Sequence, residues 1–289
     1  MMLPTGCTEI QPRFLDIQGH RGARAVRPEN SIPGFLYAAG IGVTTLELDV
    51  IVTAAKDIVV SHEPWLNPDI CTGPDGEALS STARSSLYPM QLADIRQCDC
   101  GRHGHPRFPN QQRMLTHKPT LAEVAAAVAD GERPEGLPPV AFNIEIKHDA
   151  AEVGVHFPEA GVAASLVLAE IQRLGITDRT TVQSFSAEVL EAVHAAQVGV
   201  RTAWLMEGER TVNEALSLLS FRPDIYSPHH VLLSPEEIAA AHQLGVAVVP
   251  WTVNDPQRMA ELIGWGVDGL ISDDPGLALQ VSQTQPETP

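Results

Sequence analysis

The 289-residue chain has few cysteines, few aromatic residues and no apolar run long enough to cross a membrane. Its four cysteines, Cys7, Cys71, Cys98 and Cys100, are too few and too unevenly spaced for a disulfide scaffold, so reduced thiols are expected. Residues 1–14 have neither the basic nor the apolar region of a signal peptide. These absences predict a cytoplasmic protein without stable membrane insertion.

Basic residues are also scarce. The chain has 19 Lys and Arg against 36 Asp and Glu, a formal net charge of −17 at pH 7. Such a charge argues against nucleic acid as a partner and against anionic membrane surfaces. An anionic small molecule would therefore need a few concentrated cations or a bound metal ion. This requirement applies to any phosphate-binding hypothesis.

The chain nevertheless has enough apolar residues, 44%, for a sizeable core, and no linker divides it. Short apolar runs alternate with amphipathic segments that begin at capping residues such as Ser31, Thr120 and Ser234. The expected parallel strands are 14–20, 44–50, 140–147, 180–185, 201–206, 224–227, 246–252 and 269–272. This series predicts a single α/β domain over 15–280, a (β/α)8 TIM barrel, with a polar tail at 281–289. An open doubly wound sheet is less favoured, because Gly19 and Gly22 do not form a Gly-rich phosphate loop.

A β-hairpin and a long insertion follow the second strand. Too few residues separate Val50 from Ile58 for a helical crossover, so the run from Ile58 should return antiparallel. A turn centred on Ala54 and Ala55 places Glu47 opposite His62. Residues 64–119 are rich in Pro, Ser and Gly and are expected to be an insertion or lid that contains one short helix, at 90–97.

Three carboxylates are expected to converge inside the barrel. Glu47 and Asp49 are two residues apart on one strand, so both point to the same face, and Glu145 alternates with Asn143 and Lys147 on a later strand. Converging carboxylates are typical ligands of a hard divalent cation, Mg2+ or Ca2+, whereas zinc would favour His and Cys. Ordinary strand-end ion pairs are the alternative for Glu47 and Asp49.

Two histidines and two cations accompany these carboxylates. His20 and His62 each end a strand, and a histidine pair can supply an acid and a base near neutral pH. Arg21 and Lys147 are suited to bind a phosphate, which provides the local positive charge required above. Lys147 could instead simply pair with Glu145.

These segments together resemble the glycerophosphodiester phosphodiesterase family over residues 15–280. The resemblance is carried by Gly19-His20-Arg21-Gly22, Pro28-Glu29-Asn30-Ser31, Leu46-Glu47-Leu48-Asp49-Val50, Val59-Val60-Ser61-His62, Asn143-Ile144-Glu145-Ile146-Lys147, Gln183-Ser184-Phe185, Trp251-Thr252-Val253-Asn254 and Asp268-Gly269-Leu270-Ile271-Ser272-Asp273-Asp274-Pro275. It implies a TIM barrel that uses a divalent metal to hydrolyse glycerophosphodiesters to glycerol 3-phosphate and an alcohol. The partner is then a small-molecule substrate.

The resemblance also implies roles for individual residues. His20 and His62 are the catalytic acid/base pair; Glu47, Asp49 and Glu145 hold the metal; Arg21 and Lys147 contact the phosphate, and Trp251 walls the glycerol site. The nucleophile is either the glycerol 2-hydroxyl, which gives a cyclic phosphate, or water. Ser31 stands where the family usually has Thr, and Glu63 where it usually has Asp; neither change removes a proposed catalytic group.

Two alternative functions are compatible with these residues. One is a phospholipase D-like or cyclic-phosphate-forming lyase that acts on intact lipids, and another is a non-catalytic barrel that binds a phosphodiester.

The run from Cys98 to His105 has Cys and His but lacks standard zinc spacing, so loop residues with reduced thiols are favoured over a zinc site. Asp273-Asp274 could contribute a carboxylate to the cleft, but a strand-to-helix turn with an Asp N-cap explains the pair as well and is the favoured interpretation. His229 and His230 are weaker candidates for substrate contact.

Overall fold

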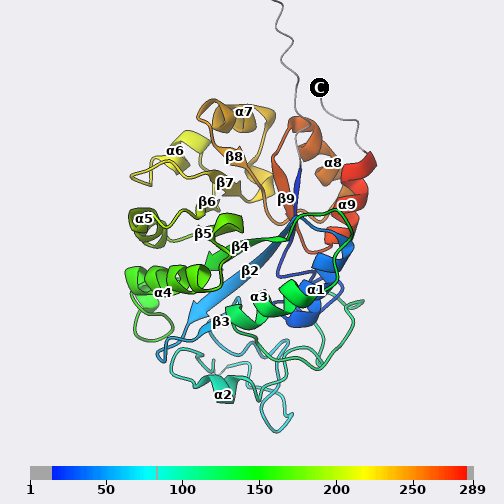
Figure 1. The fold of residues 1–289 in the computed structure, drawn as a ribbon, viewed down its shortest axis with the longest axis vertical. Coiled ribbons are helices and arrows are strands. Elements are labelled where there is room, and N and C mark those ends of the chain that lie inside the picture. The colour runs from blue at the N-terminus through cyan, green and yellow to red at the C-terminus, as the bar shows by residue number, and fades with distance from the viewer. Residues whose placement is uncertain (1–14, 83, 285–289) are drawn as a thin grey trace, which may run out of the picture.

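The computed structural model describes residues 15–82 and 84–284, and its sheet confirms the predicted barrel (Figure 1). The parallel strands are β1 (Asp16–Gly19), β2 (Thr45–Val52), β4 (Ala141–Ile146), β5 (Thr180–Ser184), β6 (Arg201–Met206), β7 (Ile225–Pro228), β8 (Ala247–Val248) and β9 (Gly269–Ser272). Each predicted parallel strand is present, although β8 is much shorter than the expected 246–252. Residue 14, the expected first residue of the series, lies outside the described residues.

The parallel strands lie in the order β8-β7-β6-β5-β4-β2-β1-β9. Backbone hydrogen bonds continue from the β8 side to β9: Asp268 N–H donates to Val248 O (2.8 Å), and Ile271 N–H to Pro250 O (3.0 Å). The sheet therefore almost closes into a ring. All carboxyl ends of the parallel strands meet at one rim, which is the face where TIM barrels bind ligands.

The hairpin forms, but its predicted register is off by one residue. The antiparallel strand β3 (Ile58–Val60) pairs with β2, with Val50 opposite Val60 and Val52 opposite Ile58. Glu47 is thus not opposite His62 as predicted. The turn is longer by one residue than a loop centred on Ala54 and Ala55, with Lys56 at a positive φ of 72°. His62 nevertheless returns to the barrel rim.

Helices cover the outside of the barrel (Figure 1). The α-helices are α1 (Ile32–Ile41), α2 (Leu92–Ile95), α3 (Leu121–Asp130), α4 (Ala160–Arg173), α5 (Ala187–Ala196), α6 (Val212–Leu216), α7 (Pro235–Gln243), α8 (Pro256–Trp265) and α9 (Pro275–Thr284), and short 3₁₀ turns lie at Ala150–Glu152, Thr177–Arg179 and His230–Leu232. The predicted N-caps Ser31, Thr120 and Ser234 all accept a backbone N–H. Because α9 continues to Thr284, residues 281–284 are helical and do not belong to the predicted tail; residues 285–289 lie outside the described part.

Alternation along β2 separates core from site. Leu46, Leu48 and Val50 are fully buried in a cluster with residues of the surrounding helices, such as Phe35 of α1. The intervening side chains of β2 point the opposite way, into the barrel. One strand therefore supplies both the packing that holds α1 and the carboxylates of the interior.

The insertion packs as a separate small cluster on the barrel, and it corrects one expectation. Cys71 and Cys100 form a disulfide, so reduced thiols were the wrong prediction for this pair. Folding of the insertion brings together two cysteines 29 residues apart, which sequence spacing alone does not reveal. Cys98 is buried and free, and Cys7 lies outside the described residues. Because Cys100 is part of the disulfide, it has no thiolate to offer, and the alternative zinc site from Cys98 to His105 does not form.

Within residues 15–82 and 84–284, no helix combines the length and the apolarity that crossing a membrane requires.

Candidate active site

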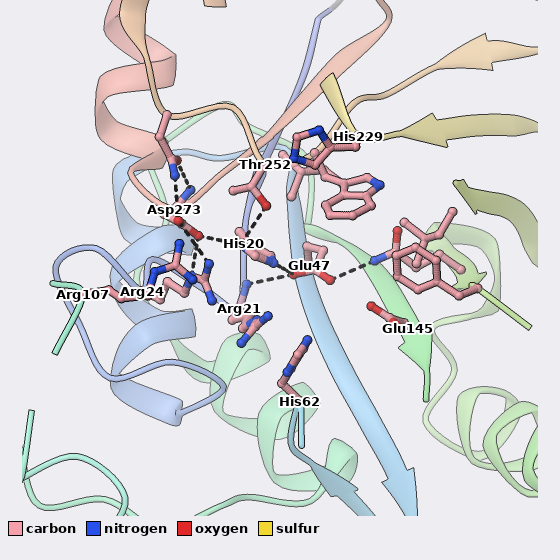
Figure 2. Close-up of a pocket in the computed structure, with 16 residues that line it drawn as sticks. His20, Arg21, Arg24, Glu47, His62, Arg107, Glu145, His229, Thr252 and Asp273 are labelled. Atoms are coloured by element: carbon pink, nitrogen blue, oxygen red, sulfur yellow. Dashed lines mark hydrogen bonds and ion pairs between the residues drawn. The ribbon is translucent and has the colours of Figure 1, made fainter. Parts of the chain in front are cut away.

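A cavity of about 310 Å3 opens at the carboxyl ends of the barrel strands (Figure 2). Its lining residues are His20, Arg21, Arg24, Glu47, His62, Arg107, Glu145, Gln183, Phe185, Leu205, His229, Trp251, Thr252, Asn254, Ile271 and Asp273. The cavity thus brings together six of the eight predicted site residues. The other two, Asp49 and Lys147, do not line it but contact residues that do.

The three predicted metal ligands converge. The parallel register of β2 and β4 places Asp49 beside Glu145, and Glu47 lies two residues before Asp49. One oxygen from each of the three buried carboxylates lies within 4.8 Å of the others. Burial, together with the charge of Asp49, raises the pKa of Glu47 well above its usual range. Burial also raises the pKa of Glu145. The cluster therefore carries more negative charge than its surroundings favour.

Nearby cations offset part of this charge. Lys147 Nζ lies 2.7 Å from Glu145 Oε1 and 3.4 Å from Asp49 Oδ1, and Arg21 Nε lies 3.3 Å from Asp49 Oδ2. Burial opposes ionisation of Asp49, but Lys147, His62 and Arg21 outweigh it and hold its pKa well below the usual range. Lys147 thus does pair with Glu145, as the alternative interpretation stated. Among the described residues, however, no lysine pairs with Glu47. An all-carboxylate donor set with residual negative charge fits a hard divalent cation.

His20 is held by the carboxylate of Asp273. His20 Nδ1 lies 2.5 Å from Asp273 Oδ1, and Arg24 Nε donates to the same oxygen at 2.6 Å. Asp273 therefore contributes a carboxylate to the cavity, which was the less favoured of the two interpretations of this pair. The adjacent Asp274 does act as a cap, accepting from Leu277 N–H at 3.1 Å.

This contact determines the tautomer of His20. Burial lowers the pKa of His20 to about 4, so the ring is neutral at pH 7. The pKa of Asp273 is held low, against the effect of its burial, by His20 and Arg24. An ionised carboxylate only accepts hydrogen bonds, so Nδ1 carries the ring proton. Nε2, 3.9 Å from Glu47 Oε2, is then an unprotonated acceptor that faces the carboxylates.

His62 has a similar arrangement on the other side of Glu47. Its Nδ1 lies 3.0 Å from Glu63 Oε1. The side chain of His62 keeps 33% of its surface exposed, against 11% for His20. Figure 2 shows both rings directed toward the region around Glu47 and Glu145. The site thus contains two histidine–carboxylate pairs, one buried and one accessible.

A strained turn between β1 and α1 positions Arg21. Arg21 adopts a positive φ of 50°, and its N–H donates to Glu47 Oε2 at 2.8 Å. Its guanidinium donates to Glu29 Oε1 at 3.0 Å. A Cβ at Gly19 would lie 2.1 Å from Gly22 O, so the tight turn requires glycine there. The backbone strain is located at the cavity, as is common in functional sites.

Comparison with known proteins agrees with this geometry. Residues 20–277 match the glycerophosphoryl diester phosphodiesterase family. The chain belongs to this family. It is 28% identical over 89% of its length to a Caldanaerobacter subterraneus glycerophosphodiester phosphodiesterase, 93% of which is covered, and 27% identical over 95% to one from Bacillus subtilis, 88% of which is covered.

A solved structure extends the agreement to three dimensions. A Silicibacter pomeroyi protein named for the same family superposes with a TM-score of 0.82 at 29% identity, and 94% of each chain is covered. Family membership makes this chain an enzyme that hydrolyses phosphoric diesters. The predicted family and fold are both confirmed.

The site also includes residues to which the sequence analysis assigned no role. Asn30 Nδ2 donates to Asp49 Oδ2 (2.8 Å), and Gln183 Nε2 donates to Glu47 Oε1 (2.8 Å). Both amides orient metal-ligand candidates. Their signal in the sequence was that both lie in segments that carry the family resemblance; that Gln183 lies beside Glu145 of β4 is shown only by the structure. Arg24 and Arg107 gave no comparable signal.

One wall of the cavity is aromatic. The rings of Phe185 and His229 each meet Trp251 edge-on, with centroids 5.4 Å and 5.2 Å away. Trp251 Nε1 donates to Ser227 O at 2.8 Å, which fixes the indole plane. Trp204, by contrast, is buried in the core. The weak expectation that His229 reaches the site agrees with its position on the cavity wall.

Proposed function

We propose that this enzyme hydrolyses glycerophosphodiesters to sn-glycerol 3-phosphate and an alcohol, by acid/base catalysis with His20 and His62 at a divalent metal site. The observation that carries the proposal is the convergence of three buried carboxylates and two histidines, each histidine paired with its own carboxylate. Support for the substrate comes from the named activities of the relatives.

Glu47, Asp49 and Glu145 would hold the metal, Mg2+ or Ca2+. When bound, the cation supplies charge stabilisation to a nonbridging phosphate oxygen. The amides of Asn30 and Gln183 fix the orientation of two of these carboxylates through the hydrogen bonds described above. The protein therefore contributes a donor set that is already oriented before substrate arrives.

His20 accepts the proton of the nucleophile at Nε2. Its neutral tautomer, set by Asp273, leaves this nitrogen unprotonated. His62 is the proton donor to the departing alcohol, and the Glu63 carboxylate beside it offsets the positive charge of the protonated ring. The nucleophile is the glycerol 2-hydroxyl or water; both require the same proton acceptor.

Arg21 and Lys147 balance phosphate charge, and Trp251 contacts the glycerol carbons. Arg21 is held rigidly between Glu29 and Asp49, so its guanidinium is preoriented. The aromatic wall of Trp251 and Phe185 offers apolar surface to the C–H groups of glycerol. Phosphate then lies between this wall and the carboxylate cluster.

The decisive experiment measures release of glycerol 3-phosphate from glycerophosphocholine, with and without EDTA. We expect turnover in the wild type, loss of turnover with EDTA, and recovery with excess Mg2+ or Ca2+. His20→Ala should lose activity on the order of 100-fold or more. His117→Ala, which removes an exposed histidine outside the cavity, is the matched control. Metal-independent turnover, or full activity of His20→Ala, would refute the mechanism.

A further inference from the structure

We propose that Arg107 is a specificity residue that recognises an anionic group on the leaving alcohol, so that the enzyme prefers glycerophosphodiesters whose head group carries a phosphate or a carboxylate. The inference rests on the proposed function and adds the chemistry of the head group to it. Arg107 belongs to the 64–119 insertion, far in sequence from the catalytic segments, and lines the same cavity.

Arg107 lies beside Arg24 at one end of this cavity. Both guanidinium carbons approach the ring of Phe108, Arg24 at 5.2 Å from its centroid and Arg107 at 5.6 Å. Figure 2 shows the two arginines to one side of His20 and His229 to the other. The cavity therefore has a cationic end and an aromatic end, with the catalytic groups between them.

The charge of Arg107 is available to a ligand, unlike that of Arg24. Arg24 is paired with Asp273 (2.6 Å) and with Glu29 (3.6 Å). Arg21 and Lys147 are paired with carboxylates as described above. The Arg107 side chain is exposed, and no carboxylate of residues 15–82 and 84–284 forms an ion pair with it. An unpaired guanidinium at a cavity mouth is suited to bidentate binding of a carboxylate or phosphate.

The orientation of the bound substrate follows from the aromatic and cationic ends of the cavity. With glycerol against Trp251 and the phosphate at His20 and His62, the second ester arm extends toward the cationic end. In a chain of net charge −17, an anion gains access only where cations are concentrated. Arg107 supplies that charge at the position of the head group.

The insertion is anchored where this role requires it. His105 Nε2 lies 3.5 Å from Glu29 Oε2, and Gln111 Nε2 donates to Arg24 O at 2.7 Å. Residues on both sides of Arg107 thus contact the β1–α1 segment that carries the catalytic turn. Arg107 is therefore held at the cavity by contacts on both of its flanks.

The test compares kcat/KM for substrates that differ in head-group charge. Glycerophosphoglycerol has a neutral leaving alcohol, and bis(glycerophospho)glycerol adds a phosphodiester to that alcohol. Glycerophosphoserine has a carboxylate together with an ammonium group, and glycerophosphocholine has only a cation. The variants are Arg107→Gln and Arg107→Glu. Arg102→Gln is the control, because Arg102 is an equally basic side chain of the same insertion, 70% exposed and outside the cavity. Thermal unfolding checks that all variants fold.

We expect the wild type to favour bis(glycerophospho)glycerol over glycerophosphoglycerol. Arg107→Gln should lower that ratio by up to about fivefold, the upper end of the usual range for a solvent-accessible ion pair. Arg107→Glu should lower it further and favour glycerophosphocholine, while Arg102→Gln leaves the ratio unchanged. A loss confined to glycerophosphoserine would identify the carboxylate as the recognised group, and a loss confined to bis(glycerophospho)glycerol the phosphate.

Two results would overturn this inference and leave the proposed function intact. One is a substrate ratio that Arg107→Gln and Arg107→Glu leave unchanged. The other is an equal loss in Arg102→Gln, which would indicate a general charge effect. Absence of turnover on all four substrates would instead overturn the proposed function, and the inference with it.

Discussion

Asp273 Oδ1 lies 2.5 Å from His20 Nδ1, although the two residues are 253 positions apart in the chain. The contact joins the loop after the last strand, β9, to the loop after the first, and this is possible because β1 and β9 pair in parallel. Closure of the barrel therefore builds part of the site, since it brings Asp273 to the buried histidine that we propose as the proton acceptor.

Replacing that carboxylate should impair catalysis more than binding. We expect Asp273→Asn to lower kcat on the order of 100-fold, because the amide no longer holds the Nδ1–H tautomer of His20 by charge. KM should change little, since Asp273 faces the histidine. Steady-state kinetics on glycerophosphocholine gives both values. Asp274→Asn is the control: it keeps a good N-cap for α9 and should behave as wild type. Equal kinetics for the two variants would contradict the positioning role.

Divalent cations should bind the carboxylate cluster independently of turnover. After EDTA treatment, excess Mg2+ or Ca2+ should stabilise the folded wild type by about 3 kcal/mol at 100 times the Kd. Its unfolding temperature should therefore rise. Glu145→Gln should abolish this shift, because it replaces one of the three clustered carboxylates by a neutral amide. Glu132→Gln, at an exposed position, should retain it. Differential scanning fluorimetry measures the shift; an unchanged shift in Glu145→Gln would exclude this residue as a ligand.

The insertion should depend on its disulfide. Removing the Cys71–Cys100 crosslink by Cys71→Ser should cost about 3.6 kcal/mol, the value that loop-closure entropy gives for cysteines 29 residues apart. Urea denaturation compares this variant with Cys98→Ala, in which the crosslink remains. Peptide mapping without reductant should recover Cys71 and Cys100 in one linked fragment. Separate peptides for the two cysteines would restore the original expectation of reduced thiols.

Stability at high pH should reflect Tyr226. Burial raises the pKa of its hydroxyl to about 12, above the usual value of about 10. Because the pKa is higher in the folded state, the unfolded chain loses this proton first. The contribution of Tyr226 to stability is therefore fully present below pH 10 and is lost as the pH rises through 12. Tyr226→Phe should remove this component, about 2 to 3 kcal/mol between pH 9 and 12. Chemical denaturation of both proteins at several pH values tests the sign; parallel curves would contradict it.

Much of the chemistry was determined by the sequence. The period-two spacing of Glu47 and Asp49 placed both carboxylates on one side of β2, because successive side chains of a strand alternate. Alternating strand and helix patterns predicted the barrel, and capping residues such as Ser31 and Thr120 predicted the start of their helices. These are local properties, and local properties are readable from residue types and spacing.

Tertiary structure decided what depends on closure and on loop packing. The hairpin register shifted by one because the turn at Lys56 takes an extra residue, which short-range patterns do not specify. Asp273 is a histidine partner only because β9 lies against β1, whereas capping by Asp274 is a local contact with Leu277 N–H. Likewise the insertion joins Cys71 to Cys100 and brings Arg107 to the cavity through contacts that link residues remote in sequence. The sequence thus determined which groups the candidate site contains, whereas the closed barrel determined which partners they contact.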